Sequence, residues 1–146
     1  MSDAFAIKFD GDDALAGLDM IAKEAINVRP AAQAGAQVLY DEVLLRVPVS
    51  TKVRKLKSGR TIAPGALKAS IYQVFSEDNS GRALATYHVS WNYRKAPHGH
   101  LVEFGTSRAP AKPFLRPAYE AKAPEALEAS RARWVQDVQA LIASMQ

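Results

Sequence analysis

Two alternating stretches that flank a short polar segment constrain the fold of this chain more than any other feature. Side chains alternate with a period of two in residues 69–76 and again in residues 84–93, where Tyr87 and Trp91 share one side. This is the period of a half-buried β-strand. The intervening EDNSGR, residues 77–82, is dense in turn-forming residues. We therefore predict an antiparallel hairpin, and no feature suggests a parallel sheet of the Rossmann type.

The N-terminal third is predicted to contain one strand and two helices. Residues 5–9, FAIKF, have the pattern of a short edge strand. Apolar residues at helical spacing then predict one helix that begins at residue 12 or 13 and ends near residue 28. A second helix is predicted from Pro30 to about Arg46, and Pro48 stops it.

The C-terminal third is also predicted to be largely helical. An apolar stripe at helical spacing predicts a helix from Pro113 or Pro117 to the C-terminus. Within it, Pro124 either kinks the helix or marks its true start. The preceding HLVEF, residues 100–104, is too short for its period to decide between a strand and a helical turn.

These elements predict a single α+β domain over residues 1–146, with an antiparallel sheet packed against N-terminal and C-terminal helices. A composition of 48% hydrophobic residues is sufficient for one real core. No apolar run is long enough to cross a bilayer, and the first residues are acidic rather than a basic leader, so we expect a soluble chain without the usual secretion signal. The absence of cysteine excludes disulfides and thiolate sites and fits a reducing cytoplasm.

Charge is distributed unevenly along the chain, although the formal net charge is only +4. Residues 1–24 hold six acidic side chains against two lysines, whereas residues 43–76 hold no carboxylate. Residues 49–66 within that stretch are predicted to form a long mobile basic loop. Its cations are Lys52, Arg54, Lys55, Lys57 and Arg60.

The basic loop has two interpretations that the sequence favours equally: a solvated loop, or a contact for nucleic acid. Residues 44–70 contain no aromatic side chain that could stack on bases. Any nucleic-acid contact would therefore be to phosphate, with weak sequence dependence and strong salt dependence.

No pattern of catalytic or metal-binding residues is present. His98 and His100 lie two apart but without cysteine or a second paired carboxylate, so we assign no metal. A hydrolase constellation of His98, Glu103 and a serine would lack the G-x-S-x-G elbow that positions the nucleophile. No phosphate-binding loop occurs either. We therefore expect a chain that is not an enzyme and that needs no cofactor.

The most distinctive segment is HLVEFGTSRAPAKPFLRPA, residues 100–118. Gly105 can adopt backbone angles closed to other residues, and the prolines stiffen the connection, so a shaped turn is predicted. Phe114 and Leu115 lie on this segment as apolar anchors. For Phe114 two roles are equally weighted: pinning the last helix to the sheet, or contacting a neighbouring protein.

This segment resembles the signature of the neck or minor tail-component proteins of long-tailed bacteriophages and prophages, which act in head–tail joining or tail completion. Members carry a V-E-F-G-T turn followed by P-F-L-R-P-A. A weaker similarity is P-V-(S/D)-T followed by G-x-L-K-x-S-I, matched here by residues 48–51 and 65–71. In the family the two halves sit close together, whereas here VRKLKSGRTIAP, residues 53–64, separates them.

The resemblance implies a structural subunit of the virion, made in the host cytoplasm, that forms or completes a ring between head connector and tail tube. Implied partners are further copies of itself, head-closure or connector proteins, tail terminator or tail-tube proteins and, in transient contact, phage DNA. The runner-up is a small basic nucleic-acid-binding protein. The implied assembly motif comprises Glu103, Phe104, Gly105, Thr106, Pro113, Phe114, Leu115, Arg116 and Pro117.

A closed ring needs two different complementary patches on each copy. The acidic residues 1–24 and the basic loop are a candidate pair, whose opposite charges would orient association more than strengthen it. In the alternative arrangement, the basic loop lines a central channel for DNA.

Overall fold

The computed structural model describes residues 5–10 and 27–144. Its main sheet has the order β1-β5-β4, formed by Phe5–Asp10, Leu84–Trp91 and Ile71–Phe75, and both pairings are antiparallel. The predicted hairpin is confirmed as β4 and β5, and β1 is the predicted edge strand. The first hairpin strand is shorter than predicted, because its first two residues end a short helix instead. The second strand is also shorter, because it ends at Trp91 rather than at residue 93.

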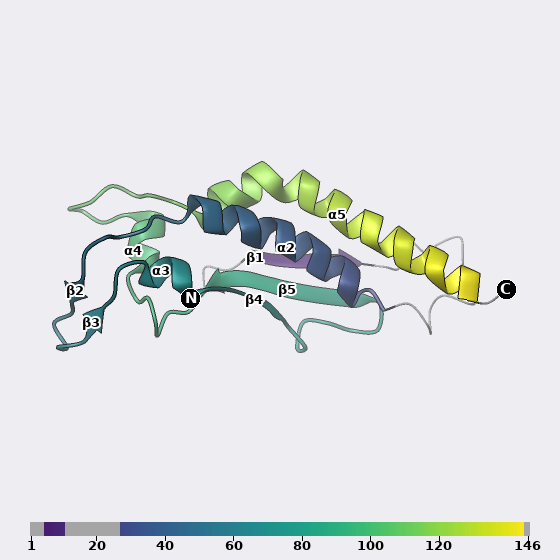
Figure 1. Ribbon diagram of the computed structural model, residues 1–146, viewed down its shortest axis with the longest axis horizontal. Helices are drawn as coiled ribbons and strands as arrows, with labels where there is room; N and C mark the ends of the chain where they lie inside the picture. Colours follow the sequence, from purple (N-terminus) through teal and green to yellow (C-terminus); the bar gives the residue numbers. More distant parts are fainter. Residues whose placement is uncertain (1–4, 11–26, 145–146) are drawn as a thin grey trace.

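Two long helices lie on one face of this sheet (Figure 1). Helix α2, Arg29–Arg46, packs directly on the sheet, and α5, Leu115–Ser144, packs mainly on α2 and runs in the opposite direction. The α+β class and the predicted helix from Pro30 to Arg46 are thus confirmed. The helix predicted over residues 12–28 lies almost entirely outside the described residues.

The C-terminal helix begins within the predicted range. Helix α5 starts at Leu115 and continues through Pro124, so the interpretation that Pro124 marks its start is wrong. The open question at HLVEF is also answered, because Gly99–Phe104 forms the short helix α4. In the part of the chain that the structure describes, no helix has the length and apolarity needed to cross a membrane.

Helices α2 and α5 approach closely because small residues line their contact. The buried side of α2 carries Ala32, Gly35 and Ala36. A Cβ atom on Gly35 would collide with the hydroxyl of Ser130 and lie 2.9 Å from the carbonyl oxygen of Ala126, both on α5. Glycine at this position is therefore required by the spacing of the two helices.

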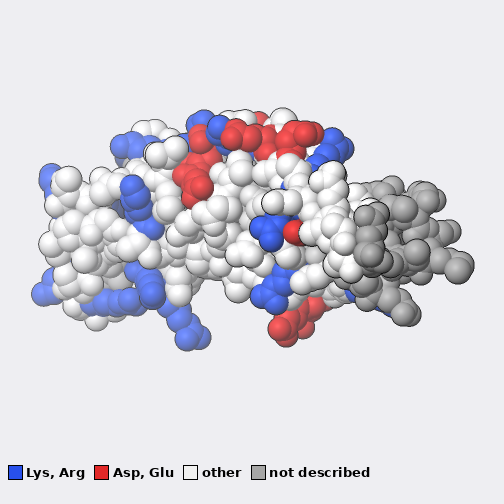
Figure 2. All heavy atoms as spheres, turned by 45° about the vertical axis from the view of Figure 1, so that its right-hand side comes forward, with Lys and Arg blue, Asp and Glu red and all other residues white. Residues whose placement is uncertain are grey.

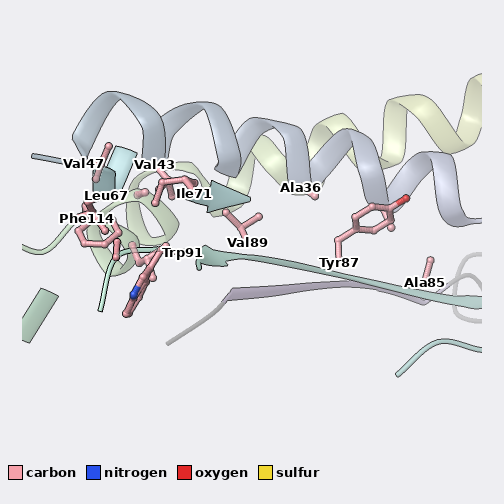
Figure 3. Packing of buried hydrophobic residues seen from close by; sticks show 14 of the residues in the cluster. Ala36, Val43, Val47, Leu67, Ile71, Ala85, Tyr87, Val89, Trp91 and Phe114 are labelled. Carbon is pink, nitrogen blue, oxygen red and sulfur yellow. The ribbon is translucent and has the colours of Figure 1, made fainter. Parts of the chain in front are cut away.

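The hydrophobic core lies between α2 and the sheet and extends toward the start of α5 (Figure 3). Val43 of α2 and Val89 of β5 are fully buried within it. At one end, the rings of Trp91 and Phe114 meet edge to face, with centroids 5.8 Å apart. Core residues thus come from the N-terminal, middle and C-terminal thirds of the chain.

The basic segment, residues 49–66, differs from the prediction of a loop without regular structure. It contains a two-stranded antiparallel hairpin, β2 at Arg54–Lys55 and β3 at Thr61–Ile62, which leads to the four-residue helix α3, Ala66–Ala69. The backbone N–H of Leu56 donates to the carbonyl of Arg60, closing the turn. Ile62 is the one buried residue of these two short strands.

Candidate assembly site

Glu103 ties the two halves of the distinctive segment together. Its carboxylate lies at the end of α4 and accepts hydrogen bonds from three backbone N–H groups at the start of α5. The bonds from Phe114 and Leu115 measure 2.8 and 3.1 Å to Oε2, and that from Arg116 measures 3.1 Å to Oε1. Glu103 is only 5% exposed. It is therefore a side-chain cap for α5, supplied from an earlier helix.

The connection between α4 and α5 is a shaped turn centred on Gly105. This residue has a φ of 77°, in the range that glycine tolerates best, and a Cβ there would lie 2.6 Å from the backbone nitrogen of Ala111. The hydroxyl of Thr106 accepts bonds from the N–H groups of Arg108 and Ala109 at 3.2 and 3.0 Å. The turn is thus held by its own hydrogen bonds, and the predicted shaped turn is confirmed.

The two apolar anchors of the segment are buried in the chain itself. Phe114 is 0% exposed and Leu115 is 2% exposed, so neither side chain presents a surface to a neighbour. For Phe114, the structure favours the first of the two predicted roles, which is to pin the last helix. The aromatic residue that the motif does expose is Phe104, at 66%.

The remaining motif residues lie on the outside of the turn. Pro113 is exposed and Pro117 half-buried. The guanidinium of Arg116 is 3.0 Å from the carboxylate of Glu120, one turn further along α5, and both side chains are well exposed. The accessible part of the motif therefore comprises Phe104, Thr106, Pro113 and Arg116.

The second, weaker motif is brought together by the hairpin that interrupts it. The backbone N–H of Gly65 donates to the carbonyl of Ser50 over 3.0 Å. The two halves of the motif, residues 48–51 and 65–71, therefore meet in space. The insertion between them forms the projecting β2–β3 hairpin. Sequence spacing alone did not indicate this closure.

The five cations predicted for the basic loop are all exposed on this projecting region. They are Lys52, Arg54, Lys55, Lys57 and Arg60. On the face drawn in Figure 2, lysines and arginines gather without acidic neighbours at the end of the molecule where the hairpin lies. Acidic residues instead mix with basic ones over the helices.

A pocket of about 280 Å³ lies at the base of the hairpin. It is lined by both halves of the second motif, by Val102 of α4 and by Lys112 of the turn that precedes α5. The pocket was not predicted, because it forms only where these separate segments meet. The available signal was the positive charge of Lys52, Arg54 and Lys112, which lie on two of these segments.

The three histidines do not assemble a metal site with other described residues. His98 lines the pocket, and burial, with Arg54 and then His100 beside it, lowers the pKa of its imidazole. Both oxygens of Glu103 accept hydrogen bonds from backbone N–H groups. This carboxylate therefore holds the start of α5 and does not serve a proton relay with His98.

Comparison of the chain with protein-family models, curated proteins and solved structures found no match. The interpretation of this chain as a phage neck protein therefore stays a prediction.

Proposed function

We propose that this chain is a structural subunit of a long-tailed phage or prophage particle, one that joins head and tail by forming or completing a ring between connector and tail tube. Its partners would be further copies of itself and the connector, terminator or tube proteins on either side. It acts by binding and makes or breaks no covalent bond.

The observation that carries this proposal is the way Glu103 unites the E-F-G-T turn with the P-F-L-R-P-A segment. A buried carboxylate that bonds three backbone N–H groups holds the turn in one shape. A preformed turn loses little conformational entropy when it docks. The turn presents Phe104, and exposed aromatic side chains are common anchors in protein interfaces.

A particle experiment tests this proposal. We expect the protein in purified particles, detected by mass spectrometry, and expect disruption of its gene to leave heads and tails that do not join. The variant Phe104→Ala should fold normally and reduce joining, whereas Arg131→Ala on the outer side of α5 should not. Absence of the protein from every mature particle and every assembly intermediate would refute the proposal.

A second candidate function, contact with DNA, is favoured by the exposed cations of the hairpin. Because residues 43–76 contain no carboxylate, the hairpin has no acidic residue of its own to offset them. Binding of labelled duplex DNA should fall steeply with added salt and weaken in Lys57→Gln and Arg60→Gln. Binding that does not respond to salt, or no binding at all, would remove this candidate.

A further inference from the structure

The pocket at the base of the hairpin has an excess of positive charge. Lys52, Arg54 and Lys112 line it, and no carboxylate is among the described residues of its wall. His98 completes the wall, and its buried Nδ1 atom has no hydrogen-bond partner. The lowered pKa of His98, caused first by burial and then by Arg54, fits a site whose positive charge is not balanced by the described residues that line it. Such a pocket favours a carboxylate-bearing occupant.

The turn between β4 and β5 supplies carboxylates of this kind. Glu77 and Asp78 are exposed and form no ion pair with any residue of the described ranges. The turn has a fixed shape, because the N–H of Ser80 donates to the carbonyl of Glu77 at 3.1 Å and the hydroxyl of Thr86 donates to the carbonyl of Asn79 at 2.6 Å. Two adjacent, exposed acidic side chains thus lie on a turn that is held by hydrogen bonds.

The pocket and this turn lie at opposite ends of the sheet. The pocket lies beside α3, which directly precedes Ile71, and Ile71 pairs with Trp91 at the far end of β5. The turn joins the other ends of the two strands. Figure 1 shows the same separation, with the β2–β3 hairpin at one extreme and the β4–β5 turn displaced along the sheet. The eight residues of β5 span roughly 23 Å at about 3.3 Å per residue.

One copy therefore cannot place its own turn in its own pocket, but a second copy can. We propose that the acidic turn of one copy, through Glu77 and Asp78, docks in the basic pocket formed by Lys52, Arg54 and Lys112 of the next copy. The contact joins two different patches, so it is the head-to-tail kind that closes into a ring when the rotation between copies allows it. This inference rests on the proposed function, because it identifies the contact between ring subunits.

Complementary charge reversal tests the contact directly. One variant carries Glu77→Lys with Asp78→Lys, and the other carries Lys52→Glu with Lys112→Glu. Each variant alone would bring like charges together and should associate with itself at least about tenfold more weakly than the wild type. A mixture of the two restores opposite charges at every contact, so we expect association to return. Sedimentation velocity at protein concentrations up to about 1 mM detects contacts of this weak class.

Two control variants separate this contact from general electrostatics. Lys57→Glu reverses one positive charge on the hairpin, outside the pocket wall, and Glu128→Lys reverses one negative charge on an exposed face of α5. Both should associate like the wild type. Loss of association in either control, or failure of the mixed pair to associate, would overturn the proposal.

The outcomes also separate this inference from the proposed function. Wild-type association that both reversals leave unchanged would place the subunit contact on another surface, with the ring proposal still standing. A wild type that does not associate at any accessible concentration would overturn the pocket contact, while detection of the protein in particles would still support its role as a subunit.

Discussion

Removing the carboxylate of Glu103 should be one of the most damaging single changes in the turn. In Glu103→Ala, the buried N–H groups of Phe114 and Leu115 lose their acceptor, and a buried donor without a partner costs about 1–3 kcal/mol. The third N–H, that of Arg116, is only partly buried, so water can replace its bond at lower cost. We expect the free energy of unfolding to fall by about 3 kcal/mol, which corresponds to a decrease in Tm of roughly 6–12 °C for a chain of this size.

Urea denaturation followed by circular dichroism measures this change. Glu103→Gln keeps one acceptor oxygen but turns an amide NH₂ toward a backbone donor, and should lose about 1–2 kcal/mol. The control Glu120→Ala removes an exposed partner of Arg116, and should change stability by less than about 0.5 kcal/mol. If Glu103→Ala were as stable as Glu120→Ala, the argument that this carboxylate holds the start of α5 would be refuted.

Three further predictions concern packing and protonation. Gly35→Ala should destabilise the folded chain by about 1–3 kcal/mol, because the added methyl group meets Ser130. Gly81→Ala should be nearly neutral, because the space around its Cβ is open. Urea denaturation compares the stability of the two variants. Phe114→Ala should cost about 3–5 kcal/mol by the same measurement, and a cost below that of an exposed substitution would contradict its core role. Because the pKa of His98 in the folded chain lies below 6.5, the unfolded chain takes up this proton first as the pH falls. The stability that neutral His98 contributes is therefore present above pH 6.5 and is lost as the pH falls through the folded-state pKa. The variant His98→Gln should reduce this pH dependence of stability, and an unchanged pH profile would contradict the role given to His98.

The hairpin and the helices of this fold could be predicted from the sequence, because side-chain periodicity and turn residues specify them over short stretches of chain. A period of two on each side of EDNSGR specified the β4–β5 hairpin, and Pro30 placed the start of α2. The strand boundary at residue 71 was misplaced, because a short helix uses the two preceding residues. Periodicity identifies elements better than their ends.

The geometry of the candidate site depended on contacts that sequence spacing does not reveal. The phrase E-F-G-T was distinctive, but only the folded chain shows that Glu103 reaches the backbone at the start of α5. Sequence reasoning gave Phe114 equal chances of burial and exposure, and packing against Trp91 decided for burial. It gave Phe104 only as one member of the implied assembly motif, and the structure shows that Phe104 is the aromatic residue of that motif left on the surface.

The sequence by itself determined the α+β class, the hairpin, the shaped turn, and the contrast between the acidic residues 1–24 and the basic segment. Tertiary structure alone decided which charges share a pocket and which carboxylates lie at the other end of the sheet. The physical reason is that periodicity and turn chemistry act over a few residues, whereas burial and charge complementarity arise between segments far apart in the chain.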